Sequence, residues 1–346
     1  MKKTLVLVLG LLLVFAAPAF AAGQLSIFMW SEYMDPEIIT AFEKEYDIKV
    51  RLDYYESNEE MVAKLQHGGL GLYDIIVPST YTVASLRNLD LIEPLNHELL
   101  PNIQNLDPAF TAMTADPGNE YTVPYQWGTS GLGVRATDIS QVKKSFAVLF
   151  DPAAEVGPFV VFDTARDAIG SALKYLGYSM NSTNPKELEE ASRLLVETKK
   201  RPAFIGFDGG VGGLNKVMSG VARAAQIYNG EGIRAMDEDP QLHYFLPEEG
   251  GEIWTDLIAV PRRAPNSANA HAFINYLMTP EVAAQLATYN RYATPVAAAK
   301  PFIPESDLAN PVMYPSPETL RNFEYLQDLG PANRLYDEAW TLIKTR

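Results

Sequence analysis

The sequence contains no cysteine and only four histidines among its 346 residues. A chain without cysteine can form no disulfide, offers no thiol nucleophile and has no cysteine for a lipid anchor. The histidines are scattered, with no carboxylate or second histidine nearby at a metal-ligand spacing. We therefore expect no metal site, and we interpret the four as surface or packing residues: His67, His97, His243 and His271.

Two further signs of catalysis are missing. No serine lies in the G-x-S-x-G pattern of a nucleophile elbow. The glycine cluster at residues 206–213 lacks the lysine and hydroxyl that complete a phosphate-binding loop, so we interpret it as a flexible surface turn. The sequence thus predicts no catalytic residues and no cofactor.

Basic residues are scarce as well. The chain has 28 Lys and Arg against 43 Asp and Glu, a formal net charge of −15 at pH 7. An acidic excess of this size repels nucleic acid and anionic lipid, and it favours a cationic partner in solution. Acidity that only keeps an exported protein soluble explains the charge equally well, so charge alone does not identify a ligand.

The N-terminal residues have the three parts of a secretory signal peptide: Met1-Lys2-Lys3, an apolar run over residues 5–17, and the small-residue site Ala19-Phe20-Ala21. The apolar run is shorter than the roughly 20 residues of a membrane-spanning helix, and no later segment is longer or freer of charge. We predict that residues 1–21 are cleaved and that the mature chain lies in the periplasm without inserting into the membrane.

The rest of the chain alternates extended and helical signals, the pattern of an α/β fold whose sheets are covered by helices. We expect strands at residues 25–30, 48–54, 73–77, 159–162 and 253–258, and helices at 35–45, from 57, 78–89, 163–176, from 184, 269–278, 279–289, 317–326 and 333–343. The length suggests two domains. Because no low-complexity linker separates them, we predict two lobes joined by crossing strands: residues 22–130 plus about 258–300, and about 131–257 plus about 301–346.

Several helix starts carry capping signals. Asp35 and Asn184 each precede a proline, which suits the first helical position, and Ser57 has a glutamate three residues on, the spacing of a capping box. These residues predict where three of the helices begin.

Aromatic residues stand beside carboxylates at three predicted strand ends: Trp30-Ser31-Glu32-Tyr33, Tyr228-Asn229-Gly230-Glu231 and Trp254-Thr255-Asp256. Strand ends in open α/β sheets are where ligands bind. A lone tryptophan beside an acid is usually half-buried packing, but three such pairs favour a binding site. A polyamine needs aromatic walls for its methylenes and carboxylates for its ammonium groups, so this pattern fits that ligand class.

The chain resembles the spermidine/putrescine-binding proteins of bacterial polyamine transporters. The matching runs occur in order from about Leu25 to the C-terminus, at residues 29–33, 54–59, 73–81, 123–128, 165–167, 174–179, 249–251, 254–256 and 292–295. The resemblance implies the two-lobed periplasmic binding protein fold of type II, in which each lobe is a mixed sheet flanked by helices and the ligand lies in the interlobe cleft. It also implies a monomer whose partners are a polyamine ligand and the membrane permease of an ABC transporter.

By the same resemblance, the cleft residues are Trp30, Ser31, Glu32, Tyr33, Ser79 and Tyr81 in the first lobe, and Thr164, Asp167, Tyr228, Trp254 and Asp256 in the second lobe and hinge, while Tyr292 adds another aromatic wall. Three acids would then meet ammonium groups: Glu32, Asp167 and Asp256. Five rings would enclose the methylenes: Trp30, Tyr33, Tyr228, Trp254 and Tyr292.

Three positions depart from the spermidine-binding pattern. Thr164 replaces an acid, Leu326 replaces a glutamine, and Tyr228 replaces a tryptophan. In contrast, Glu231 stands where putrescine-binding members carry an aspartate, and Ser31 also matches them. The resemblance therefore favours the shorter diamine slightly and leaves the choice between putrescine and spermidine open.

Other functions of the same fold remain as alternatives. A sugar-binding protein would use amide side chains more than a ring of acids. A ferric-ion binder would want paired tyrosines, but Tyr54 and Tyr55 lie on one predicted strand and should point to opposite faces. An enzyme built on this fold would turn over its ligand, which an assay on polyamines would detect.

Overall fold

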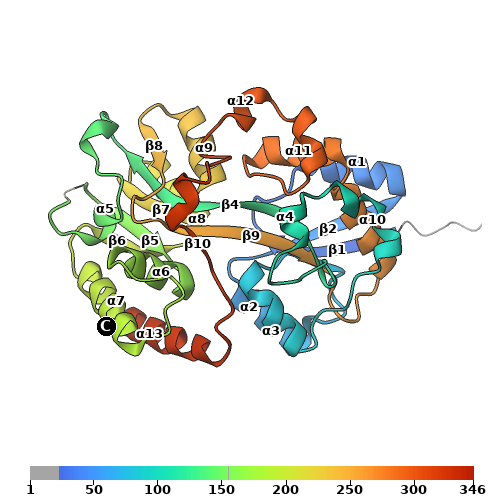
Figure 1. The fold of residues 1–346 in the computed structure, drawn as a ribbon, viewed down its shortest axis with the longest axis horizontal. Coiled ribbons are helices and arrows are strands. Elements are labelled where there is room, and N and C mark those ends of the chain that lie inside the picture. Colours follow the sequence, from blue (N-terminus) through green and yellow to red (C-terminus); the bar gives the residue numbers. More distant parts are fainter. Residues whose placement is uncertain (1–22, 155) are drawn as a thin grey trace, which may run out of the picture.

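The computed structural model describes residues 23–154 and 156–346, and the predicted signal peptide lies outside them. Figure 1 shows two α/β lobes joined across the middle by β4 (Thr122–Arg135) and β9 (Glu252–Ala259). One sheet path runs through both lobes in the order β2-β1-β3-β9-β4-β7-β5-β6, with β10 paired to β9 and β8 to β4. Within these residues, no helix is both long and apolar enough to cross a membrane.

The first lobe is built on β1 (Gly23–Trp30), which pairs in parallel with β2 (Ile48–Tyr55) and β3 (Ile75–Ile76), while β3 pairs antiparallel with β9. The predicted strands are confirmed, although the third is shorter than expected. Tyr55 is buried and Tyr54 is exposed, as the alternation of strand side chains requires. The flanking helices are α1 (Pro36–Tyr46), α2 (Asn58–Lys64), α3 (Val83–Asn88), α4 (Pro108–Thr111), α10 (Ser267–Leu277), α11 (Pro280–Asn290) and α12 (Glu305–Leu308).

The predicted capping residues begin the predicted helices. The Asp35 carboxylate accepts a hydrogen bond of 2.8 Å from the Glu37 N–H at the start of α1. The Ser57 hydroxyl accepts one of 3.1 Å from the Glu60 N–H at the start of α2. Asn184 accepts one of 3.1 Å at the start of α7 (Pro185–Lys199). Each of these side chains accepts a hydrogen bond from an N–H group of the first turn, which has no acceptor within its own helix.

The second lobe contains β5 (Phe159–Phe162), β6 (Phe204–Asp208), β7 (Ala224–Tyr228) and β8 (Leu242–Phe245), with helices α5 (Ala147–Phe150), α6 (Ala165–Tyr175), α7, α8 (Gly210–Met218), α9 (Asn229–Glu238) and α13 (Asn333–Thr345). Interpreting residues 206–213 as a flexible surface turn was wrong, because they end β6 and begin α8. The lobe has its own apolar core, which includes Leu132, Phe159, Leu173, Leu195 and Ile343.

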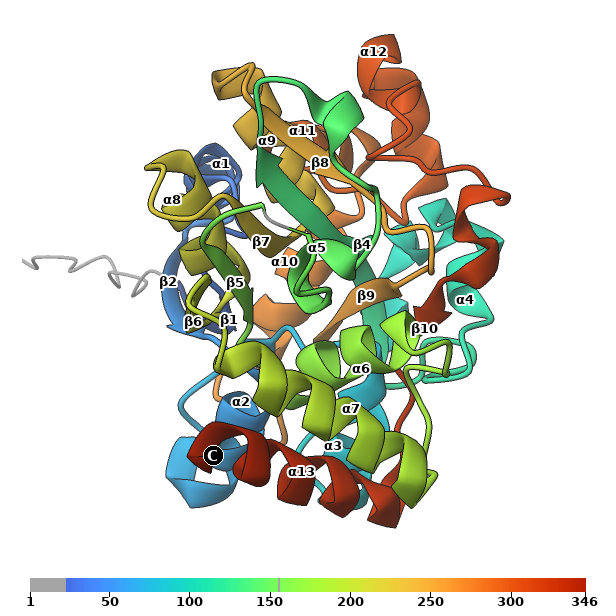
Figure 2. The same ribbon diagram turned by 90° about the vertical axis from the view of Figure 1, so that its left-hand side faces the viewer.

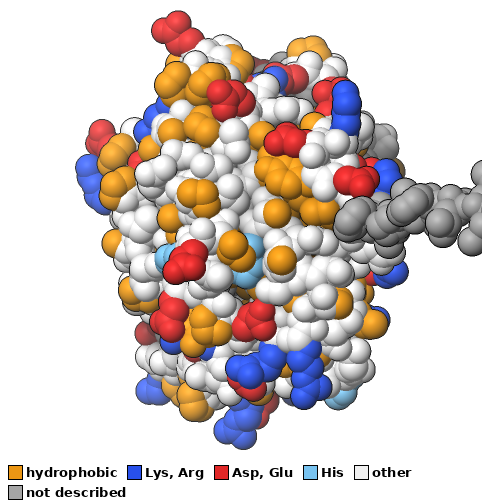
Figure 3. All heavy atoms as spheres, turned by 90° about the vertical axis from the view of Figure 1, so that its right-hand side faces the viewer, with side chains coloured by type: hydrophobic (Ala, Val, Ile, Leu, Met, Phe, Trp, Pro, Cys, Tyr) orange, Lys and Arg blue, Asp and Glu red, His pale blue; other side chains and the backbone are white. Residues whose placement is uncertain are grey.

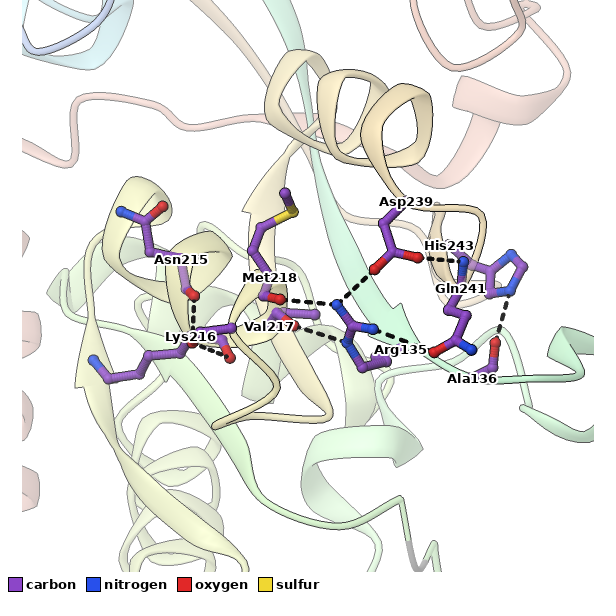
Figure 4. Close-up of polar contacts among 10 residues, drawn as sticks. Arg135, Ala136, Asn215, Lys216, Val217, Met218, Asp239, Gln241 and His243 are labelled. Carbon is purple, nitrogen blue, oxygen red and sulfur yellow. Dashed lines mark hydrogen bonds and ion pairs between the residues drawn. The ribbon is translucent and has the colours of Figure 1, made fainter.

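Strand β4 belongs to both lobes. Its first half pairs antiparallel with β9, with a bulge between Pro124 and Gln126, and its second half pairs with β7 and β8. Arg135 at its far end donates hydrogen bonds to the carbonyls of Val217 and Met218 and pairs with Asp239 (Figure 4). These partners lie at the C-terminal ends of α8 and α9, so Arg135 fixes two helices whose N-terminal ends carry site residues.

The C-terminal segment crosses from one lobe to the other. Ile303 and Met313 pack in the first-lobe core, whereas Tyr336 and Ile343 of α13 pack in the second-lobe core. Figure 2 shows α13 beside α7 on the outside of the second lobe. The predicted helix at 317–326 is wrong, because that stretch forms a short 3-10 turn and then β10 (Glu324–Tyr325), whose backbone pairs with β9.

Candidate functional site

A cavity lies between the lobes and contains about 970 Å³ of space, including the part open to solvent. The size suits a small organic ligand. All thirteen residues predicted from the sequence line it: Trp30, Ser31, Glu32, Tyr33, Ser79, Tyr81, Thr164, Asp167, Tyr228, Glu231, Trp254, Asp256 and Tyr292. The fold thus brings together side chains that are up to 262 positions apart in the sequence.

The first-lobe wall forms where β1 and β3 end. The indole N–H of Trp30 donates a hydrogen bond of 2.9 Å to the Val77 carbonyl, which fixes the ring at the end of β1. Asn58 accepts a bond of 3.0 Å from the Ser79 N–H and donates one of 2.9 Å to the Tyr81 hydroxyl. Asn58 therefore holds both residues that follow β3, and the sequence analysis did not identify it.

The second-lobe wall forms at two helix N-termini. Asp167 is the third residue of α6, where its carboxylate accepts a hydrogen bond from the Thr164 hydroxyl. Glu231 is the third residue of α9, and it accepts a bond of 3.3 Å from the Tyr228 N–H. Negative side chains are favoured at helix N-termini, where unpaired N–H groups carry partial positive charge.

Strand β9 supplies the residues that lie between these walls. Because side chains alternate along a strand, Glu252, Trp254 and Asp256 share one face, and all three line the cavity. Asp256 accepts a hydrogen bond of 2.6 Å from the Ser79 hydroxyl, and Glu252 accepts one of 2.7 Å from the Ser130 hydroxyl. The sequence analysis missed Glu252, although its spacing of two from Trp254 was a usable signal.

Aromatic rings surround Trp254. Its ring centroid lies 5.0 Å from that of Tyr292, 5.9 Å from that of Tyr228 and 6.5 Å from that of Tyr33, in edge-to-face arrangements. Gly230 permits this packing, since a Cβ atom there would lie 2.5 Å from a Tyr292 ring carbon. The rings form an apolar box that suits methylene groups and cations alike.

Acids far outnumber bases around the cavity. Within residues 23–154 and 156–346, its lining contains one basic residue, Arg234, and eight acids: Glu32, Glu56, Glu59, Asp163, Asp167, Glu231, Glu252 and Asp256. On the outer face of the first lobe, by contrast, acidic and basic side chains mix with small separate apolar groups (Figure 3). The carboxylates gathered around the cavity favour a cationic ligand.

Burial raises the pKa of four of these acids, Glu59 among them. It raises the pKa of Glu231 to about 7, and it raises the pKa of Asp256 to about 7 despite the opposing hydrogen bond from Ser79. Burial, followed by the neighbouring Asp167, raises the pKa of Glu252 well above its usual range. Carboxylates desolvated in this way are stabilised by a positive charge brought into the cavity. In the described residues, no group of three or more His, Cys, Asp or Glu is placed to hold a metal ion.

Comparison with known proteins agrees with this geometry. The chain is 36% identical over 331 residues to the spermidine/putrescine-binding periplasmic protein of Escherichia coli (strain K12), covering 95% of this chain and 94% of that protein. It is 32% identical over 341 residues to the putrescine-binding periplasmic protein SpuD of Pseudomonas aeruginosa, covering 93% and 92%.

A solved structure resembles the whole described fold. The spermidine/putrescine ABC transporter substrate-binding protein PotD from Streptococcus pneumoniae matches with a TM-score of 0.77 and 30% identity, over 93% of this chain and 99% of that one. The predicted type II periplasmic binding protein fold is thereby confirmed. Residues 37–311 match the family described as bacterial extracellular solute-binding protein, and the chain belongs to that family, among its spermidine/putrescine-binding relatives.

Proposed function

We propose that this chain captures a polyamine, putrescine or spermidine, in the interlobe cavity and delivers it to the permease of an ABC uptake transporter. The observation that carries the proposal is the convergence of aromatic rings and buried carboxylates on one cavity, where Arg234 is the single basic residue among the described ones. The names of the relatives point the same way. A sugar would find few amide partners among these acids, which disfavours the main alternative.

Each group in the cavity has a role that follows from its chemistry. Asp256, Asp167 and Glu231 meet ammonium groups, because a shielded charge pair is stronger than an exposed one, whereas the mostly exposed Glu32 mainly attracts the cation to the cavity. The rings of Trp30, Tyr33, Tyr228, Trp254 and Tyr292 enclose the methylenes and add cation-π contacts of ~0.5 to 2 kcal/mol each. The ligand then contacts both lobes, so its binding stabilises the closed arrangement.

The proposal includes where the protein works. Export through the signal peptide at residues 1–21 would place a monomeric binding protein in the periplasm, as the names of its relatives indicate for them. The boundary at which the chain finally enters the second lobe was predicted at about residue 301. We propose that it lies after Met313, because Ile303 and Met313 pack in the first-lobe core.

Isothermal titration calorimetry tests the function directly. We expect putrescine or spermidine to bind with a Kd near the micromolar range, about −8 kcal/mol, because several shielded charge pairs must outweigh the ordering of a flexible ligand. Glucose and glutamate serve as controls for the sugar and amino-acid classes. Binding of either control, with no heat and no thermal shift from either amine at millimolar concentration, would refute the proposal.

A further inference from the structure

Glu252 makes contacts that the function described so far does not use. It lies on β9, is buried, and lines the cavity. One of its oxygens accepts the hydrogen bond from Ser130, and the carboxyl group of Asp167, which lines the same cavity, lies close enough to raise the pKa of Glu252. Asp167 in turn is held by the Thr164 hydroxyl. Two carboxyl groups from different elements are therefore fixed side by side in the cavity wall.

Two neighbouring carboxylates, of which Glu252 is buried and Asp167 half-buried, repel each other when both are ionised without a counter-charge. Among the described residues, the titratable groups that face this pair supply no positive charge, since they are Asp256 on β9, Tyr228 at the end of β7, Tyr81 after β3 and Glu59 on α2. Arg166 on α6 has its guanidinium 5.5 Å from the Tyr81 ring centroid, and its hydrogen bonds of 2.9 Å go to the Gln327 carbonyl and the Asn181 side chain and not to either acid. The pair must therefore hold either a proton or a ligand cation.

We propose that Glu252 and Asp167 together form a subsite for one ammonium group of the bound polyamine, an inference that rests on the proposed function. A primary ammonium group has three N–H donors, enough to bond to both carboxylates, and its charge lets both ionise. The proton that the two acids share leaves to the solvent as the ammonium group enters. Position 164, just before α6, carries a threonine and no acid. Glu252 on β9 provides a second carboxyl group beside Asp167 in its place.

The test is Glu252→Gln, titrated with putrescine and with spermidine at pH 7 in phosphate and in Tris buffer. The two buffers differ in ionisation enthalpy, so the difference in observed heat reports the protons released. We expect the variant to bind its preferred amine about 10- to 100-fold more weakly. We also expect it to release about one proton fewer than the unmodified protein, since the amide cannot hold the shared proton.

Glu189→Gln is the matched control, because it removes the same charge from an exposed position on α7. It should bind and release protons as the unmodified protein does. Thermal unfolding without ligand separates a ligand-binding role from a structural one: Glu252→Gln should keep or raise the melting temperature at pH 8, where the buried pair is most unfavourable. Lower stability together with unchanged affinity would assign Glu252 a structural role and overturn the subsite.

Asp167→Asn and the double variant complete the design. If the two acids form one subsite, the double variant should lose far less affinity than the product of the two single losses. Should Glu252→Gln fail to fold, Asp167→Asn provides the same proton measurement. Failure of the unmodified protein to bind either amine would refute the proposed function, whereas normal amine binding with equal proton release in the folded variants would refute only the subsite.

Discussion

Six of the eight acids named around the cavity fall into two groups that differ in exposure. We call the exposed ones the mouth, which consists of Glu32, Glu56 and Glu59, and the buried ones the floor, which consists of Glu231, Glu252 and Asp256. At the mouth, 63% of the Glu32 side chain is exposed and its contact with Arg234 is long, at 3.9 Å. On the floor, Asp256 is held by the Ser79 hydroxyl at 2.6 Å.

This difference separates attraction from recognition. An exposed ion pair contributes ~0 to 1 kcal/mol and weakens with salt, whereas a hydrogen bond to a shielded charge contributes ~1.5 to 3 kcal/mol. The mouth should therefore raise the local concentration of cations, and the floor should decide which cation stays. The following predictions test that division.

The largest effect should come from removing a floor charge. Asp256→Asn keeps the shape of the side chain but cannot neutralise an ammonium group, so polyamine affinity should fall about 10- to 100-fold, ~1.5 to 3 kcal/mol. Calorimetry measures the loss, and circular dichroism confirms that the variant is folded. Unchanged affinity in a folded variant would show that Asp256 is a structural residue that only bonds Ser79.

Affinity should also depend on pH. Glu231 and Asp256 have pKa values of about 7, so below that pH both carboxyl groups are mostly protonated. Each must then release its proton before it can pair with an ammonium group, which lowers the affinity. Affinity should be at least about tenfold weaker at pH 6 than at pH 8, measured by calorimetry at constant ionic strength. Equal affinity at the two pH values would contradict a buried, proton-binding floor.

Stability without ligand should change in the opposite direction. The two pKa values are raised in the folded state, so their stabilising contribution is full at acidic pH and is lost as the pH rises through about 7. The difference in free energy of unfolding between the unmodified protein and the Glu231→Gln, Asp256→Asn double variant should therefore favour the unmodified protein more at pH 6 than at pH 8. Denaturant titrations at both pH values measure it.

A smaller effect is expected from adding an acid beside the floor. Thr164→Asp adds a carboxylate beside the carboxyl groups of Asp167 and Glu252. A triamine carries one more positive charge than a diamine, so it should gain more from the added acid. Spermidine affinity should rise by about fivefold relative to putrescine affinity, ~1 kcal/mol. Equal gains for both amines would indicate general attraction, and no change for either would mean that this position does not contact the ligand.

The smallest effect should come from the mouth. Glu32→Gln should change equilibrium affinity by less than about threefold at physiological salt, because the charge is mostly exposed. Its association rate should fall more clearly at low salt, where long-range attraction is less screened. Stopped-flow fluorescence of the cavity tryptophans can measure the rate. A large loss of affinity at high salt would place Glu32 with the floor.

Local signals predicted much of this structure. Alternation placed Tyr54 and Tyr55 on opposite faces, and capping residues marked the starts of α1, α2 and α7. The thirteen predicted cavity residues came largely from a resemblance over the whole chain, and the structure brings all of them to one cavity. Their roles toward a ligand remain predictions.

Features that depend on distant partners were harder to predict. Residues 319–325 contain helix-compatible side chains, but pairing with β9 overrides that local preference. Strand β4 was not predicted at all, because its partners are distant in the sequence: its second half pairs with β7 and β8, which lie about 90 or more residues later. Glu252 was missed because its place in the cavity depends on tertiary structure: only the folded chain brings it close to Asp167 of α6.

The path of the C-terminal segment has a practical consequence. Strand β1 begins at Gly23 in the first lobe, while α13 ends beside α7 on the second lobe (Figures 1 and 2). A donor fluorophore fused before β1 and an acceptor fused after α13 would therefore sit on opposite lobes. Closure of the cavity would change their separation, so the mature chain, without any internal insertion, is suited to serve as a genetically encoded sensor of its own ligand.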